Sequence, residues 1–245
     1  MSFACAHRIR SLCALSFSSL LSACTPEVDS EDVRTDGMYA TFTAASYGAT
    51  TLVQADLDVG GPNGTDVVLE GEDELWADVE GAERRLSTDP SGRGYSGIFD
   101  GNGDGAVVTV SLRRGEHDES APGSQATMPP AFTVAFAGLE RGGRWARGEP
   151  LVITWTPAVS GTIGYHAEGS CIIAFSGATG DDGEHTFSAR DFRAFTGFEG
   201  EECDVSIELS RAGFGVVDPA FGEGGSFRTY QLRKINFTST AARSE

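Results

Sequence analysis

The chain has 245 residues, of which 36 are acidic and 18 are basic, and its formal net charge at pH 7 is −18. This length is enough for one large or two ordinary domains, and a hydrophobic content of 40% is too high for a disordered polyanion. The negative charge argues against nucleic acid as a partner, because phosphate contacts need clustered lysine and arginine side chains.

The first 23 residues have the layout of a signal peptide. A start carrying two arginines is followed by an apolar run over residues 12–21, which is too short to span a bilayer. The run leads into Leu21-Ser-Ala-Cys24, which resembles the lipobox of bacterial lipoprotein signal peptides. The alternative is an ordinary secretory signal with a chance cysteine.

The lipobox resemblance implies that residues 1–23 are removed and that Cys24 carries lipid, which makes membrane lipid an expected partner. We therefore expect an exported protein that is lipid-anchored to the cell envelope. Thr25 stands where an aspartate would signal retention at the inner membrane, which favours the outer membrane in a cell that has one. Cleavage removes two arginines and no acidic residue, so the mature chain has a formal charge of −20.

Residues 24–37 are acidic and show little periodicity, so they are expected to form a lipidated N-terminus and a tether. Residues 38–115 follow with short alternations of apolar and polar residues separated by Gly, Asn, Asp and Pro, which is typical of antiparallel strands. About seven such strands predict a first β-sandwich. Most of the negative charge lies here, because residues 24–125 hold 21 acidic and 6 basic residues.

A polar segment at 116–130, which ends in two prolines, is the predicted linker, because proline does not fit a central strand. The alternating pattern then returns over 131–240 and predicts a second β-sandwich, followed by a short tail at 241–245. The predicted fold class is all-β, with two antiparallel sandwich domains.

Two strands of the second domain carry the most information. Residues 203–211 place an apolar side chain at every second position, which predicts a strand with one buried face. In the last strand the apolar positions change parity between Leu232 and Ile235, which predicts a β-bulge.

Part of the second domain resembles a known class of module. Leu151-Val-Ile-Thr-Trp155 and the later Asp181-Asp-Gly-Glu-His-Thr-Phe187 are similar to a core strand and a turn of immunoglobulin-like and fibronectin-III-like modules. The resemblance covers about half of the domain and implies Ig-like sandwiches, with no activity attached. Trp155 precedes both later cysteines, which departs from the antibody pattern and leaves the topology open. The whole layout resembles uncharacterised exported bacterial lipoproteins.

Cys171 and Cys203 are the cysteines that remain once the signal peptide and the lipidated residue are set aside. Both lie at apolar positions of predicted strands, so both thiols are expected to point inward. An even pair in an exported protein predicts a disulfide. Two free buried thiols or a metal pair are the alternatives, although His166 and His185 do not supply the spacing of a zinc site.

Asp100-Gly-Asn102-Gly-Asp104-Gly has the spacing of a calcium-binding loop, in which alternate side chains converge on the ion. Ser111 stands where such a loop has its bidentate glutamate. A hairpin turn explains the same residues without a metal. The sequence requires no cofactor, and calcium is the one that it suggests.

Two tryptophans are candidate binding residues, because a solvent-facing indole can stack on a sugar or anchor a protein. Trp76 falls at a polar position of its strand, and Trp145 lies in a loop rich in glycine and arginine. Packing against a neighbouring sheet or domain is the alternative. The arginines of that loop, Arg141, Arg144 and Arg147, form a basic cluster that we expect to face the acidic first domain.

Catalytic motifs are absent from the sequence: it contains no nucleophile elbow, phosphate-binding loop or zinc-protease signature. The expected function is therefore that of a non-catalytic binding or structural module in the envelope, with an unknown protein or glycan as partner. One alternative is a carbohydrate-directed hydrolase or accessory subunit that uses scattered carboxylates. Another is a calcium-stiffened, adhesin-like module.

Overall fold

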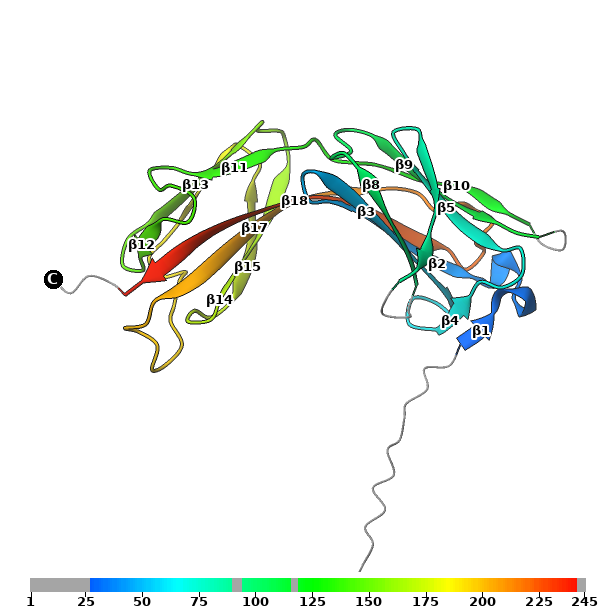
Figure 1. The fold of residues 1–245 in the computed structure, drawn as a ribbon, viewed down its shortest axis with the longest axis horizontal. Coiled ribbons are helices and arrows are strands. Elements are labelled where there is room, and N and C mark those ends of the chain that lie inside the picture. The colour runs from blue at the N-terminus through cyan, green and yellow to red at the C-terminus, as the bar shows by residue number, and fades with distance from the viewer. Residues whose placement is uncertain (1–26, 90–93, 116–118, 242–245) are drawn as a thin grey trace, which may run out of the picture.

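The computed structural model describes residues 27–89, 94–115 and 119–241. The predicted signal peptide and the lipidation site at Cys24 lie outside these residues. The described chain forms two lobes placed side by side, with the N-terminal strand and the C-terminus at opposite ends of the molecule (Figure 1). Among the described residues, no helix is long and apolar enough to cross a membrane.

Strands make up nearly all of the regular structure in the described residues. The first lobe contains β1 (Glu27–Asp29), β2 (Tyr39–Ser46), β3 (Thr50–Val59), β4 (Thr65–Val68), β5 (Glu74–Val79), β6 (Ala82–Arg85), β7 (Ser87–Thr88), β8 (Tyr95–Asp100), β9 (Val107–Arg113) and β10 (Ala121–Thr127). The second contains β11 (Thr133–Phe136), β12 (Arg144–Ala146), β13 (Leu151–Thr156), β14 (Thr162–Gly169), β15 (Phe175–Gly180) and β16 (Glu184–Phe187). Two long strands, β17 (Cys203–Phe214) and β18 (Gly225–Thr240), run through both lobes, and two single-turn 3-10 helices occupy Ser30–Asp32 and Thr35–Gly37.

One large sheet is common to both lobes, and its main order is β1-β4-β3-β2-β18-β17-β14-β15. In the first lobe a four-stranded sheet, β10-β9-β5-β6, faces it, and in the second lobe a three-stranded sheet, β11-β13-β16, does so. The predicted all-β class with sandwich-like packing is confirmed. The pairing is not purely antiparallel, because β1 with β4, β2 with β18 and β12 with β18 are parallel.

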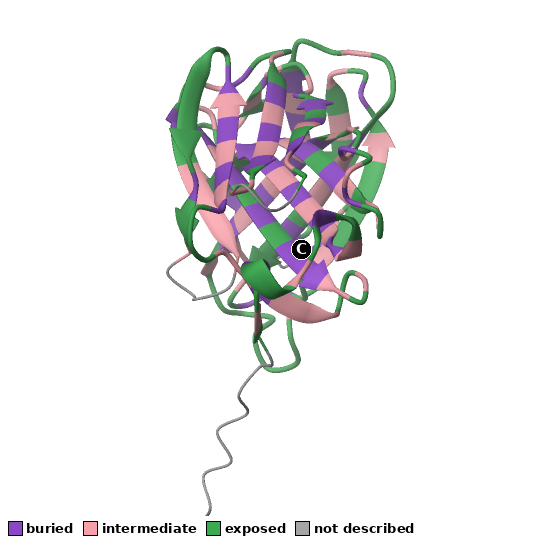
Figure 2. Ribbon diagram, turned by 90° about the vertical axis from the view of Figure 1, so that its right-hand side faces the viewer, coloured by how far each residue is buried: buried purple, intermediate pink, exposed green. Residues whose placement is uncertain are grey.

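Each lobe has its own hydrophobic core, built from the inward positions of its strands. Figure 2 shows this as buried and exposed residues alternating along the strands. In the first core Phe42 packs edge-on against Phe227, with ring centroids 5.5 Å apart. In the second core Phe237 packs edge-on against Phe136 at 5.5 Å and Trp145 at 5.7 Å. Phe227 and Phe237 belong to the same strand, so β18 contributes to both cores.

The β17–β18 pairing is regular from Cys203 opposite Ser239 to Phe214 opposite Arg228, without the predicted bulge. That prediction was wrong because it counted only apolar residues as inward. The missing inward positions are polar: Thr229 and Gln231 are fully buried on the same face as Phe227. Both side chains donate hydrogen bonds to backbone carbonyls. Thr229 Oγ1 lies 2.9 Å from the Thr127 carbonyl, and Gln231 Nε2 lies 2.7 Å from the Asn102 carbonyl.

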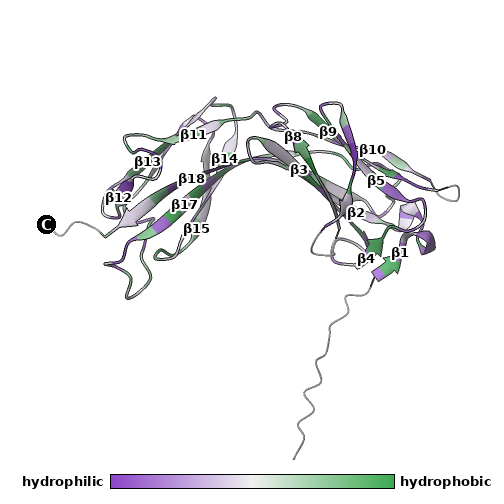
Figure 3. Cartoon of the chain, in the orientation of Figure 1, coloured by the Kyte–Doolittle hydropathy of each residue, from purple (hydrophilic) through white to green (hydrophobic). Residues whose placement is uncertain are grey.

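The segment expected to be a tether packs onto the first lobe. Strand β1 pairs with β4, with Val28 opposite Val67, and Figure 3 shows hydrophobic residues beside hydrophilic ones in both strands. Ser30 and Thr35 are buried, and Arg114 donates hydrogen bonds to the carbonyls of Ser30 at 2.8 Å and Val33 at 3.1 Å. The acidic composition concealed this contact, because the chain docks through its backbone carbonyls and not through its acidic side chains.

The expected linker contains a strand. β10 pairs with β9, and Ser124 and Ala126 on it are buried. Its small and polar residues are typical of a loop, yet β10 lies at the edge of its sheet, and Pro122 falls in a shift of register between Ala121 and Ser124. The connection between the lobes is thus short, and the two lobes also share β17 and β18.

Arg233 joins the two lobes where β18 passes between them. Its Nε donates to the Phe132 carbonyl at 2.8 Å and its Nη1 to the Ser46 carbonyl of β2 at 3.2 Å. The guanidinium lies over the Phe132 ring at 5.4 Å, and the guanidinium of Arg211 lies over the same ring at 4.7 Å. Burial, followed by repulsion from Arg211, lowers the pKa of Arg233. These contacts fix the position of the second lobe, which carries the candidate site.

Candidate functional site

A hollow of the second lobe lies beside the disulfide and has a volume of about 620 Å³. We call it the disulfide pocket. It lies over the outer face of β14, β17 and β18, with the segment after β14 and the loop before β17 at its rim. Its lining consists of Glu168, Gly169, Ser170, Ile172, Ala174, Phe195, Asp204, Val205, Ser206, Lys234 and Asn236.

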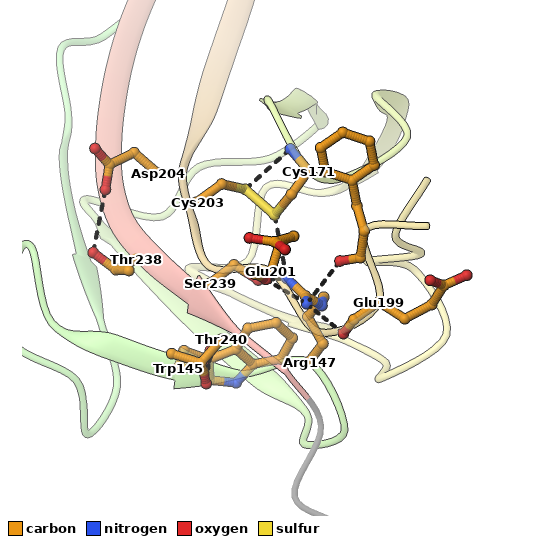
Figure 4. The surroundings of a disulfide bond; sticks show 11 residues. Trp145, Arg147, Cys171, Glu199, Glu201, Cys203, Asp204, Thr238, Ser239 and Thr240 are labelled. Atoms are coloured by element: carbon orange, nitrogen blue, oxygen red, sulfur yellow. Dashed lines mark hydrogen bonds between the residues drawn. A yellow bond between two sulfur atoms is a disulfide. The ribbon is translucent and has the colours of Figure 1, made fainter. Parts of the chain in front are cut away.

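Cys171 and Cys203 are joined in a disulfide, as predicted. Cys203 begins β17, whereas Cys171 lies just after β14 and donates its backbone N–H to Cys203 Sγ at 3.2 Å. Figure 4 shows the bond at the centre of a dense polar network. The bond holds Ser170 and Ile172, on one wall of the pocket, against Asp204 on its floor.

Arg147 anchors the loop that follows β16. Its side chain is only 6% exposed and donates to the carbonyls of Glu199 at 2.8 Å and Glu201 at 2.7 Å. The same guanidinium donates to Ser239 Oγ and to Cys171 Sγ, both at 3.2 Å (Figure 4). The expectation that Arg147 faces the first domain was therefore wrong, because the irregular loop 195–202 needs donors for its carbonyl groups.

Arg144 of that predicted basic cluster also stays within the second lobe. Arg144 forms an ion pair with Glu202, and both side chains are exposed. Arg233 of β18 makes a contact between the lobes instead, to the carbonyls of Phe132 and Ser46. The opposite charges of the arginines and the first lobe did not predict where these side chains lie. Exposed ion pairs contribute little to stability, whereas buried carbonyl groups must be hydrogen-bonded.

The floor of the pocket is a ladder of polar side chains. Lys234 Nζ lies 3.1 Å from Glu168 Oε1, and Ser206 Oγ donates to the same oxygen at 3.3 Å. The hydrogen bond and charge of Lys234 lower the pKa of Glu168. Asn236 lies opposite Ser206 in the β17–β18 register, so the amide extends this row. The floor thus offers charged and neutral hydrogen-bonding groups within one surface.

One wall of the pocket is aromatic and exposed. Phe195 is 43% exposed, and Phe198 beside it is 46% exposed, with their rings 6.4 Å apart. The Phe195 backbone is nevertheless fixed, because its N–H donates to the Cys171 carbonyl at 3.2 Å. A fixed, exposed ring beside hydrogen-bonding groups is the arrangement that recognises ligands with an apolar face and a polar edge, such as sugars.

The ion pair with Lys234 does not favour Glu168 as a general acid. A glycosidase needs a carboxylic acid of raised pKa, whereas Lys234 lowers the pKa of Glu168. Carboxyls of raised pKa lie in the first lobe instead: burial and the neighbouring Asp66 raise the pKa of both Asp56 and Asp58. The pocket thus places hydrogen-bonding groups beside an exposed aromatic ring.

The two candidate tryptophans have different environments. Trp145 is only 7% exposed, and its ring packs 4.8 Å from Phe192. The proposal of a solvent-facing Trp145 is corrected, because β12 pairs with β18 and turns the indole into the second core. Trp76 is half-buried on its sheet, where Arg113 lies 4.3 Å over the ring and Nε1 donates to Glu74 Oε2 at 2.8 Å. A binding role for Trp76 stays a prediction.

The calcium-like residues form the loop between β8 and β9, next to the junction of the lobes. Asn102 Oδ1 accepts the Asp104 N–H at 3.1 Å, and Asp104 Oδ1 accepts the Ala131 N–H at 2.8 Å. Asp100 is exposed at the end of β8. Two of the three oxygen-bearing side chains thus already accept hydrogen bonds, Asn102 within the turn and Asp104 from the start of the second lobe. Within the described residues, no group of three or more His, Cys, Asp or Glu could hold a metal ion. Calcium binding at this loop stays a prediction.

Comparison with known proteins assigns no family. No protein-family model matches the sequence, and no curated protein sequence matches it. Among solved structures, trypsin-activated alpha-2-macroglobulin from Escherichia coli is similar at 7% identity over 82% of this chain and 16% of that chain, with a TM-score of 0.24. Red sea bream transglutaminase is similar at 12% identity over 82% of this chain and 31% of that chain, with a TM-score of 0.18. This chain spans less than a third of either protein, and likenesses at this level carry no functional argument.

Proposed function

We propose that the chain is an exported lipoprotein of the cell envelope that acts as a non-catalytic, glycan-binding module built from Ig-like sandwiches. The observation that carries the binding role is the disulfide pocket, where the exposed ring of Phe195 stands beside the polar ladder of Lys234 and Glu168. Uncharged sugars suit this pocket, because its one lysine is already paired with a carboxylate. The lipoprotein assignment is supported by the lipobox-like sequence before Cys24.

The position of the pocket suits a module displayed from a membrane. Only two residues separate Cys24 from β1, which is part of the first lobe. The disulfide pocket lies in the second lobe, away from β1 (Figure 1). An anchor at Cys24 would therefore hold the acidic first lobe next to the lipid and present the pocket away from it.

The binding role is tested with a glycan array and a pull-down from envelope extract. The Phe195→Ala variant should lose about 5- to 150-fold in affinity for any retained glycan, since loss of stacking and contact area costs about 1–3 kcal/mol. Phe214→Ala is the matched control, because Phe214 is 76% exposed but lies at the far end of β17. Equal binding by both variants, or no glycan retained, would refute the proposal.

The anchor is tested separately by metabolic labelling with a radioactive fatty acid. Wild-type protein should take up label and fractionate with membranes, whereas Cys24→Ser should do neither. The hydrolase alternative predicts release of reducing sugar from a retained glycan, with loss of that activity in Glu168→Gln. Binding without turnover would support the non-catalytic role.

A further inference from the structure

A second hollow of the second lobe, with a volume of about 630 Å³, lies at the edge formed by β15 and the loop after β16. We call it the arginine pocket. It is lined by Tyr165, Phe175, Ser176, Arg190, Asp191 and Arg193. None of these residues lines the disulfide pocket, so the two hollows are separate.

One side of the arginine pocket is aromatic and held in place by the second core. Tyr165 stacks on His185 with ring centroids 5.1 Å apart, and its ring lies 6.3 Å from that of Phe175. Phe175 in turn packs edge-on against buried Phe192 at 5.1 Å. Gly177 leaves room for the tyrosine, since a Cβ there would come within 2.3 Å of Tyr165 Oη. The aromatic wall is thus preformed.

The other side carries two cations without a partner. The side chains of Arg190 and Arg193 are exposed and make no hydrogen bond or ion pair with any residue that the structure describes. Asp191 stands between them, but its Oδ2 accepts the Ser188 N–H at 2.7 Å and the Ser188 hydroxyl at 3.1 Å. The carboxylate is therefore engaged in closing the turn.

The backbone that carries these arginines is fixed from both sides. The Arg193 N–H donates to the Asp191 carbonyl at 3.1 Å, and the Arg193 carbonyl accepts the Ile173 N–H at 2.8 Å. Ala194 bridges to Ile172, next to the disulfide. A fixed backbone lowers the entropy lost when a ligand binds, because only the two long side chains remain to be ordered.

Among the described residues, exposed Arg141 and Arg228 also make no ion pair, but Arg190 and Arg193 lie together in the lining of one hollow. Most exposed arginines of the first lobe are already compensated, as in Arg85 with Glu74 and Arg113 with Glu83. A guanidinium fork matches the two oxygens of a carboxylate or phosphate. The chemistry that satisfies this pocket is therefore an anionic group that reaches the arginines while the rest of the ligand covers the aromatic wall.

We propose that the arginine pocket binds an anionic sugar, with Arg190 and Arg193 holding its carboxylate or phosphate and Tyr165 and Phe175 contacting its ring. The class is an acidic glycan, because the aromatic wall favours a ring and the two exposed arginines favour a negative charge. This site goes beyond the proposed function, which uses the disulfide pocket and uncharged sugars.

The test is calorimetry on the full chain with five probes: trigalacturonic acid, its methyl ester, glucose phosphate, inorganic phosphate and hexaglutamate. The charged sugars should bind, whereas the methyl ester should bind at least about tenfold more weakly, because a charge-assisted hydrogen bond is worth about a factor of ten. The two charged sugars distinguish carboxylate from phosphate, and binding of either one supports the proposal. Binding should weaken as salt is raised.

The variant Arg190→Gln/Arg193→Gln should lose at least about tenfold in affinity for the charged sugar. The control Arg141→Gln/Arg228→Gln removes the same charge from two exposed arginines outside the pocket, and it should bind like wild type. Phe175→Leu should weaken binding of the sugar but not of inorganic phosphate.

Three results would overturn the proposal: no binding of either charged sugar, equal loss in both double variants, or hexaglutamate binding as tightly as the sugars through the same arginines. The last result would identify an acidic peptide site instead. Phe195→Ala should still bind the charged sugar. This result distinguishes a failure of the proposal for the disulfide pocket from a failure of the proposal for the arginine pocket.

Discussion

Removal of Arg211 should destabilise the second lobe more than any exposed substitution. Arg211 and Asp181 are 2% and 3% exposed, and they form two parallel contacts, at 2.6 Å from Nε to Oδ2 and at 2.8 Å from Nη2 to Oδ1. Arg211 Nη1 also donates to the Pro130 carbonyl at 3.0 Å, and Trp155 Nε1 donates to Asp181 Oδ1 at 2.6 Å. Asp181 and Trp155 are buried in the second lobe, whereas Pro130 lies exposed at its entry.

The size of the effect follows from what each substitution leaves behind. Arg211→Met removes the cation and leaves the Asp181 carboxylate buried with Trp155 as its remaining side-chain donor, which costs about 3–5 kcal/mol. The change is a large part of the 5–15 kcal/mol by which a domain is usually stable. Adding Asp181→Asn removes the stranded charge and keeps an acceptor for Trp155. The double variant should therefore regain more than half of the loss.

The assay is urea unfolding followed by tryptophan fluorescence, since Trp155 lies within the network. The three variants and wild type form a double-mutant cycle, in which a strong coupling between Arg211 and Asp181 is expected. A loss below about 1 kcal/mol in Arg211→Met would place the pair among weak surface ion pairs. A double variant no more stable than the single one would show that the stranded charge is not the cause.

Two further predictions concern the disulfide and the acidic first lobe. Replacing Cys171 and Cys203 by alanine should lower the free energy of unfolding by about 3–4 kcal/mol, because the bond closes a loop of 32-residue separation. Urea unfolding curves of the wild-type protein that are the same with and without reductant would contradict this. Asp58→Asn should raise the melting temperature at pH 7, because Asp58 lies directly opposite Asp66 and such like-charge pairs cost about 0.2–1 kcal/mol. Burial and Asp66 raise the pKa of Asp58 in the folded state. Above this raised pKa the ionised carboxylate therefore lowers the stability of the fold. The loss of stability disappears as the pH falls towards the pKa that Asp58 has in the unfolded chain. Melting curves at pH 7 and at acidic pH should therefore show a gain that shrinks with acidity, and a constant gain would exclude the charge as its cause.

Alternation of apolar residues predicted the class of fold and some of its strands well. In β17 Val205, Ile207 and Leu209 are buried as their spacing indicates. The same rule failed where buried positions are polar. Gln231 on β18 continues the inward face, yet it was counted as outward because its burial depends on a carbonyl from a distant loop. Local pattern cannot reveal a partner that is far away in the sequence.

The candidate sites were predictable only in part, for the same physical reason. The cysteine pair and the outward polar face that includes Asp204 and Ser206 follow from strand parity alone. The exposed ring of Phe195 does not, because its loop is shaped by Arg147 and the disulfide from distant parts of the chain. The most useful overlooked signal was Lys234, the one lysine of an acidic chain.

Strand continuity gives the display geometry its physical basis. Phe227 belongs to the first core and Phe237 to the second, ten residues further along β18, a distance of about 33 Å in an extended strand. Backbone hydrogen bonds to β17 run along that whole interval, and Arg233 ties its middle to β2. The spacing between the lobes is therefore set by a hydrogen-bonded ladder and not by a flexible linker. A lipid anchor before β1 would then fix both the distance and the direction in which the two pockets of the second lobe meet their ligands.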